Sequence, residues 1–220
     1  FVDTLLEGNG YVANGVFPDQ TAFGGDKVTT ESYDPKGAKK VLEDAGWVDT
    51  DGDGIREKDG KKLVVKWLTY PTRQELPLLA EAAQASLKEI GIEVDINNTL
   101  DVNEVVQDAS AWDVYAMANV QAPTGDPEYW FRVFALSDSA KNQGKYSNAQ
   151  LDALDEQLSQ EVDTAKRADL AVQMQQILLD DNAFVFCSFL KMSMISRSNV
   201  SNYTSHACDY YQITADLDIE

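Results

Sequence analysis

The spacing of apolar residues alternates along the chain between the period of an amphipathic helix and the near-continuous runs of a buried strand. Residues 34–46 have a helical pattern that opens with Asp34-Pro35, where the Asp can cap the helix and the Pro can take its first position. An apolar, β-rich run follows at residues 62–69, a second helical pattern covers residues 74–90, and another β-rich run occupies residues 92–97. A strand, a helix and a strand in this order predict a parallel crossover.

The chain beyond this crossover continues the same alternation. The pattern predicts a short helix at residues 101–110 and a strand at residues 112–119, so a second crossover follows the first. Further elements are expected as a helix opening at Asp126-Pro127, helices at residues 148–160 and 163–180, and a strand at residues 184–190. The fold class is therefore α/β, with a mixed sheet built on parallel βαβ crossovers and flanked by helices.

Residues 1–30 differ from the rest, because glycine and polar residues are frequent there and no apolar period is sustained. We expect this segment to be irregular and to arrive from elsewhere. The longest nearly apolar run, residues 183–190, is far shorter than the roughly 20 residues that span a bilayer. The chain opens with neither Met nor a signal-peptide pattern, which we attribute to processing or truncation.

Acidic residues dominate the charge of the chain. Among 220 residues, 37 are Asp or Glu and 18 are Lys or Arg, which gives a formal net charge of -19. This balance excludes a general affinity for nucleic-acid phosphates or anionic lipid. Small ligands and cations are the partners that the charge permits.

The sequence lacks the familiar catalytic motifs. His206 is the only histidine, which excludes multi-histidine metal sites, and neither phosphate-binding glycine loops nor the GxSxG nucleophile turn occur. No enzyme activity and no cofactor are therefore expected. Cys187 and Cys208 are the only cysteines; a buried free thiol at Cys187 is the first expectation and a disulfide between the two is the second.

Asp49, Asp51 and Asp53, within the sequence DTDGDG, resemble the first half of a calcium-binding loop. Alternating carboxylates converge on a hard cation in such a loop. The twelfth position, a bidentate Glu in an EF-hand, is Gly60 here, and no helix is predicted after it. A tight acidic turn before a strand is the main interpretation, with calcium as the alternative.

Residues 121–134 combine the end of a predicted strand, a Pro-Thr-Gly turn, the start of a helix and several aromatic residues. Open α/β sheets bind ligands beyond the carboxyl ends of their parallel strands. Phe131 and Phe134 are expected to face the core. Tyr129 and Trp130 cannot both share that face, so one of them is expected to line a cleft or to contact another domain.

Several segments in a fixed order carry a family resemblance. SYDPKGAKKVLEDAGW is followed by DTDGDGIREKDGKKL, a strand, AEAAQASLKEIGIEVDI and WDVYAMANVQAPTGDPEYWF. This order resembles the C-terminal lobe of the extracytoplasmic solute-binding proteins of family 5, which serve ABC importers of peptides, nickel and opines. The resemblance covers roughly residues 33–190.

The resemblance implies a lobe of the periplasmic-binding-protein type 2 fold. Such a lobe closes on a ligand against an N-terminal lobe of the same protein and delivers the ligand to an ABC permease. It further implies that residues 1–30 connect from that missing lobe and that residues 31–220 form the C-terminal ligand-binding lobe. The protein is then expected outside the cytoplasm, in the periplasm or as a lipoprotein anchored outside the cell membrane, with a peptide, nickel or a metal chelate as ligand.

Within the family, peptide binders resemble this chain around Asp126-Pro127 but carry an acidic residue three positions earlier that pairs with the peptide's amino terminus. That position is Pro123 here. A buried ammonium without its carboxylate is costly, so a peptide amino terminus is not expected to be held in that way. Ala122-Pro123 is more similar to the nickel branch, with its Ala-Pro-Tyr-Asp-Pro segment, although Thr124-Gly125 replaces the Tyr. A metal is expected to arrive inside an organic chelate held by aromatic and amide groups.

Six residues at or just past predicted strand ends are the expected ligand contacts: Tyr70, Asn119, Gln121, Thr124, Tyr129 and Trp130. Two alternatives from other classes stay open. One is an enzyme that uses a carboxylate pair in the same cleft, and the other is an interaction domain whose aromatic surface meets another protein.

Overall fold

The computed structural model describes residues 1–206 and 212–219 and divides the chain into two units. The sheet unit comprises Phe1, Asp3–Glu7 and Glu31–Asn119. The helical unit comprises Val2, Gly8–Thr30 and Val120–Glu220. In the described part of the chain, no helix has both the length and the apolar character that crossing a membrane requires.

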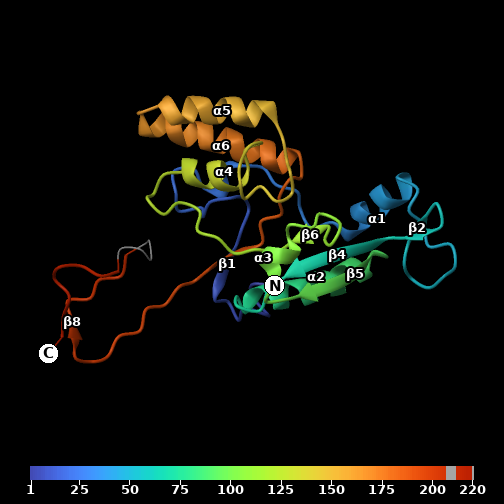
Figure 1. Cartoon of the computed structure of the whole chain (residues 1–220), viewed down its shortest axis with the longest axis horizontal. Coiled ribbons are helices and arrows are strands. Elements are labelled where there is room, and N and C mark those ends of the chain that lie inside the picture. Colours follow the sequence, from blue (N-terminus) through green and yellow to red (C-terminus); the bar gives the residue numbers. More distant parts are fainter. Residues whose placement is uncertain (207–211, 220) are drawn as a thin grey trace. The chain divides into compact units, whose positions relative to one another are not determined.

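A three-stranded parallel sheet forms the centre of the sheet unit (Figure 1). Strand β4 (Val64–Thr69) lies in the middle, with β5 (Glu93–Asn98) on one side and β6 (Val114–Tyr115) on the other. Val65 pairs with Val94, and Trp67 with both Ile96 and Val114. The two parallel crossovers expected from the apolar pattern are therefore confirmed.

Two helices, one long and one short, connect the parallel strands. Helix α2 (Glu75–Lys88) packs on β4 and β5 and buries Leu76 and Ala80. Helix α3 (Val102–Val105) contributes Val102 to a core cluster with Leu68 and Val106. Tyr70, Val105, Trp112 and Tyr115 pack against this cluster.

Two expected elements of the sheet unit are shorter than the sequence suggested. The helix at residues 101–110 ends at Val105, because the Asp108 carboxylate accepts the Ser110 amide and hydroxyl and forms a local turn instead. The strand at residues 112–119 ends at Tyr115, which pairs with Leu68 one residue before β4 itself ends. Thr69, the last residue of β4, is therefore not paired with β6.

Helix α1 (Pro35–Asp44) and a hairpin of β2 (Glu57–Lys58) and β3 (Lys61–Lys62) complete the sheet unit. Asp34 caps α1 as expected, since its carboxylate accepts the amides of Lys36 and Gly37. No residue of α1 is buried.

Buried Arg56 connects the hairpin to two neighbouring segments. Its guanidinium donates to the carbonyl oxygens of Ile90 and Trp47, both at 2.8 Å, and pairs with Glu43 at 3.0 Å. Gly91 has φ +88°, and a Cβ at that position would lie 2.7 Å from Cγ of Arg56. Only glycine therefore fits where α2 gives way to β5.

Within the described residues, the helical unit contains three α-helices. In Figure 1, α5 (Ala149–Gln160) and α6 (Thr164–Asp180) run side by side, and α4 (Glu128–Phe134) packs on α5. Asn148 and Asp163 cap α5 and α6 by accepting amides of the first helical turns. The helices expected in this half of the chain are confirmed.

Strands of the helical unit are short. Strand β1 (Gly10–Val12) pairs antiparallel with β7 (Ser188–Leu190), so only the last part of the strand expected at residues 184–190 forms. Strand β8 (Val200–Ser201) pairs with β9 (Asp218–Ile219), and η1 is a single 3₁₀ turn (Gly25–Lys27). The segment expected to be irregular thus contains one strand and one 3₁₀ turn.

The core of the helical unit joins residues that are far apart in sequence. Fully buried Gln175 of α6 accepts the amide of Val16 at 3.0 Å and donates to the carbonyl oxygen of Phe23 at 2.7 Å. Phe17 packs edge-on against Phe131 of α4, with ring centroids 5.7 Å apart. These contacts fix part of the N-terminal segment on α4 and α6.

Candidate functional site

The expected ligand contacts fall in both units, and each unit is considered by itself. Tyr70 and Asn119 belong to the sheet unit, where Tyr70 directly follows β4. The Tyr70 hydroxyl accepts the Ala118 amide at 3.2 Å. Within this unit, the carboxyl end of the central parallel strand is therefore tied to the segment that contains Asn119, and both side chains are half-buried.

In the helical unit, Gln121 and Thr124 lie on the turn that precedes α4. The amide of Gly125 donates to the carbonyl oxygen of Ala122 at 3.0 Å, which closes the turn. Gly125 has φ +80°, a conformation that favours glycine. Thr124 is exposed at the tip of the turn, while Gln121 is half-buried.

Tyr129 and Trp130 have opposite environments. Tyr129 is 39% exposed, whereas Trp130 is 3% exposed. The Trp130 ring packs against four phenylalanine rings with centroid distances from 5.3 to 5.8 Å, and these are Phe131, Phe134, Phe184 and Phe186. The expectation that only one of the two residues joins the core is confirmed. Trp130 as a ligand contact is corrected, because the aromatic cluster encloses it.

The carboxylate of Asp126, at the base of the turn, makes two sets of contacts. Its Oδ1 accepts the Glu128 amide at 2.9 Å, but the N-cap position of α4 is Pro127, so the helix starts one residue later than the predicted Asp126 cap implied. The same carboxylate pairs with Arg167 of α6 through Nε and Nη2 at 2.9 and 2.8 Å. Both of its oxygens are therefore engaged within the protein.

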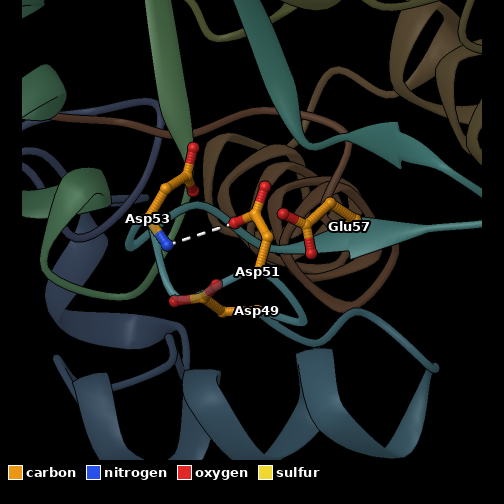
Figure 2. Close-up of side chains that lie close together, drawn as sticks. All are labelled: Asp49, Asp51, Asp53 and Glu57. Atoms are coloured by element: carbon orange, nitrogen blue, oxygen red, sulfur yellow. Dashed lines mark hydrogen bonds between the residues drawn. The ribbon is translucent and has the colours of Figure 1, made fainter.

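The calcium-like loop gathers four carboxylates. One ligand oxygen from each of Asp49, Asp51, Asp53 and Glu57 lies within 4.8 Å of the others. Figure 2 shows the carboxyl group of Glu57 directed toward that of Asp51, while Asp51 itself bonds toward Asp53. The alternation of acidic residues thus extends to the ninth position of the loop. Glu57 was not among the predicted ligands, because an EF-hand has its bidentate Glu at the twelfth position, whereas here the spacing of two residues continues from Asp53 through Ile55 to Glu57.

Bonds within the loop already engage most of these oxygens. Asp49 accepts the amides of Gly52 and Gly54 at 2.7 and 2.9 Å, and Asp51 accepts the Asp53 amide at 3.1 Å (Figure 2). Glu57 accepts the amide of Thr50 at 2.8 Å through Oε2, whereas its buried Oε1 has no partner in the described part of the chain. These bonds are typical of a tight acidic turn.

Lys62 of β3 supplies the positive charge nearest to these carboxylates. Its ammonium pairs with Asp53 and lies 4.0 Å from Asp51. The hydrogen bond with Lys62 is the main reason that the pKa of Asp53 is lowered. The loop can offer carboxylates to a hard cation only in competition with this internal ammonium.

Cys187 lies half-buried just before β7, and burial raises the pKa of its thiol. It has no disulfide partner within residues 1–206 and 212–219. Cys208 is outside the described residues, so the expected pairing is not described. His206 is exposed.

Comparison with known proteins identifies relatives of most of the chain. Residues 1–142 match the family model of bacterial extracellular solute-binding proteins, family 5 Middle. The nickel-binding protein NikA of Staphylococcus aureus (strain NCTC 8325 / PS 47) is 29% identical over 174 residues, which are 77% of this chain and 34% of that protein. The oligopeptide-binding protein AppA of Bacillus subtilis (strain 168) is 30% identical over 178 residues, 79% of this chain and 32% of that protein.

A solved structure extends the likeness to the fold. Staphylococcus aureus NikA in complex with Ni(L-His)2 matches with a TM-score of 0.80 and 25% identity, covering all of this chain and 45% of that one. The chain thus spans about a third of the length of the curated relatives and less than half of the solved chain. Its mixed α/β architecture with a parallel sheet is that of the periplasmic-binding-protein type 2 proteins of this family.

Proposed function

Because this chain belongs to the family 5 bacterial extracellular solute-binding proteins, we propose that it is the C-terminal ligand-binding lobe of the substrate-binding component of an ABC importer. Residues 31–220 would form most of this lobe, and residues 1–30 would connect it to an N-terminal lobe of the same protein. The family match over residues 1–142 is the observation that carries the proposal.

The ligand we propose is a metal chelate, with a peptide as the second candidate. An ammonium group needs a carboxylate when it is buried, and the turn before α4 has none to spare. Pro123 is buried and has no charge, and both oxygens of Asp126 are engaged by Arg167 and Glu128. A chelate that already carries its own metal ligands requires amide, hydroxyl and aromatic contacts instead.

Hydroxyl, amide and aromatic side chains are all present among the expected residues. Thr124 and Tyr129 are exposed in the helical unit, and Gln121 presents an amide on the same turn. Tyr70 and Asn119 offer a phenol and an amide at the strand ends of the sheet unit. The relative with a TM-score of 0.80 was solved with Ni(L-His)2, a chelate of this kind.

The remaining parts of the proposal follow from the family. The protein would work outside the cytoplasmic membrane, would carry out no chemical reaction on its ligand, and would deliver that ligand to a membrane permease. A carboxylate-dependent enzyme gains no support from the helical unit, because Asp126 and Glu128 are both paired with Arg167.

Calorimetry of the full-length protein tests the proposal. The probes are nickel alone, nickel with L-histidine, and short peptides. We expect the nickel–histidine chelate to bind and Tyr129→Ala to weaken binding by about tenfold or more, because an exposed aromatic contact is lost. Tyr33→Ala, which removes a tyrosine that is 79% exposed in the sheet unit, is the matched control and should leave affinity unchanged.

Two results would count against the proposal in different ways. Absence of binding by every probe would contradict the function. Unchanged affinity in Tyr129→Ala, with binding intact in the wild type, would contradict the site and leave the function standing.

A further inference from the structure

Arg167 of α6 uses its whole guanidinium group inside the helical unit. Its Nε and Nη2 bond to the two oxygens of Asp126 at 2.9 and 2.8 Å, and Nη2 also bonds to Glu128 at 3.0 Å. Its Nη1 donates to the carbonyl oxygens of Glu161, at 2.8 Å, and Leu158. These five contacts match the five N–H donors of an arginine. The side chain is only 15% exposed, so water screens the group weakly.

The five contacts join three parts of the helical unit. Asp126 ends the turn that carries Gln121 and Thr124, and Glu128 begins α4, on which Tyr129 follows directly. Leu158 and Glu161 lie at the carboxyl end of α5. Arg167 therefore fixes the base of the turn and the first residue of α4 to the junction between α5 and α6.

The bidentate contact between residue 167 and Asp126 requires an arginine side chain. A bidentate bond to a carboxylate sets both distance and orientation, which a lysine ammonium cannot do. The two carbonyl bonds hold the guanidinium plane from the opposite side. A shift of Arg167 would therefore move Asp126, and with it the turn that precedes α4.

Arg132 of α4 is a natural comparison for Arg167. It also pairs with Glu128, at 3.0 Å, and with a second carboxylate, that of Asp155 on α5, at 3.1 Å. Both partners belong to helices, and neither lies on the turn before α4. Removing Arg132 breaks a similar number of ion pairs in the same unit while leaving the base of the turn in place.

We propose that Arg167 is a positioning residue for ligand binding: it touches no ligand, but it holds the turn at residues 122–125 and Tyr129 in the geometry that binds one. This inference rests on the proposed function, because it requires the turn to contact the ligand.

The experiment compares Arg167→Met, Arg167→Lys and Asp126→Asn with Arg132→Met in the full-length protein. Amide hydrogen exchange of residues 120–129 reports the order of the turn and needs no ligand. Calorimetry with nickel and L-histidine, and with short peptides, reports affinity. Urea unfolding reports global stability. Asp126→Asn keeps the size of the side chain and weakens the contact with Arg167 more mildly, so it can be measured if Arg167→Met does not fold.

We expect exchange at residues 120–129 to accelerate in the Arg167 variants and in Asp126→Asn, and ligand affinity to fall by about tenfold or more. Compared with Arg167→Met, Arg167→Lys should restore less than half of the lost exchange protection, because lysine keeps the positive charge but cannot form the bidentate bond to Asp126. Arg132→Met should lower stability but leave both the exchange of the turn and the affinity as in the wild type.

The inference is overturned if exchange of the turn is unchanged in the folded variants, or if affinity is unchanged although exchange accelerates. Equal effects of Arg132→Met on affinity would also overturn it, because a general loss of stability would then explain the data. A wild type that binds no probe contradicts the proposed function instead, and the exchange data then decide alone whether Arg167 orders the turn.

Discussion

Adjacent residues Tyr129 and Trp130 should respond in opposite ways to replacement by alanine. Trp130 is 3% exposed and contacts four phenylalanine rings, two of which, Phe184 and Phe186, precede β7. Its removal leaves a large cavity, and a buried Trp→Ala change costs about 3–5 kcal/mol. Tyr129 is 39% exposed, so Tyr129→Ala should change stability by about 0.5 kcal/mol.

Urea unfolding followed by near-ultraviolet circular dichroism measures both variants on one scale, since the signal arises from packed aromatic rings. The expected gap between the two variants is about 3 kcal/mol. Trp130→Phe is the matched control, because it keeps an aromatic ring in the cluster and should recover part of the loss. Comparable losses in Tyr129→Ala and Trp130→Ala, or a Trp130→Ala variant as stable as the wild type, would refute the division of roles between the two residues.

Three further predictions concern buried and charged groups. Gln175→Leu should lower the free energy of unfolding by about 2–4 kcal/mol in urea titrations, because it leaves buried backbone groups without partners; a loss below about 1 kcal/mol would argue against this role. Burial raises the pKa of Asp155 despite its bond to Arg132, so the folded state binds this proton more tightly than the unfolded chain. The wild type should therefore lose stability relative to Asp155→Asn as pH rises through and above 3.8, and a gain in wild-type stability relative to the variant over this range would contradict the sign. Lys62→Met should make the melting temperature more responsive to calcium than in the wild type, because the ammonium no longer competes at Asp53; equal responses would show that no such competition exists.

Much of the fold can be predicted from the sequence, because the signals that mark helix starts and strand order are local. Three helices are capped by Asp34, Asn148 and Asp163, whose side chains accept backbone amides two and three residues ahead. The residue type at each position therefore predicts the start of the helix. The order of strand and helix patterns likewise predicts the parallel crossovers, since a parallel pair requires a long connection.

Long-range pairing marks the limit of such predictions. Strand β1 near the start of the chain forms by pairing with β7, and its three residues are too few to show a period of their own. The strand after α3 ends at Tyr115 although β4 continues to Thr69, and the local pattern of residues 112–119 does not reveal this early end.

The candidate site shows the same contrast between local patterns, which the sequence reveals, and contacts between distant residues, which it does not. A helical period shows that Tyr129 and Trp130 must face different sides, but Phe184 and Phe186 decide which of them is buried. Arg167 is 41 residues away from Asp126 in sequence and has no local signature, so only the structure assigns it to the turn.

The proposed cargo of the protein is a metal chelate. The most direct measurement is the nickel content of the purified full-length protein after equilibrium dialysis with nickel alone and with nickel plus L-histidine. We expect nickel to be retained when histidine is present and to be largely lost when it is absent. Equal retention in both conditions would contradict chelate binding, and retention in neither would contradict nickel as the cargo.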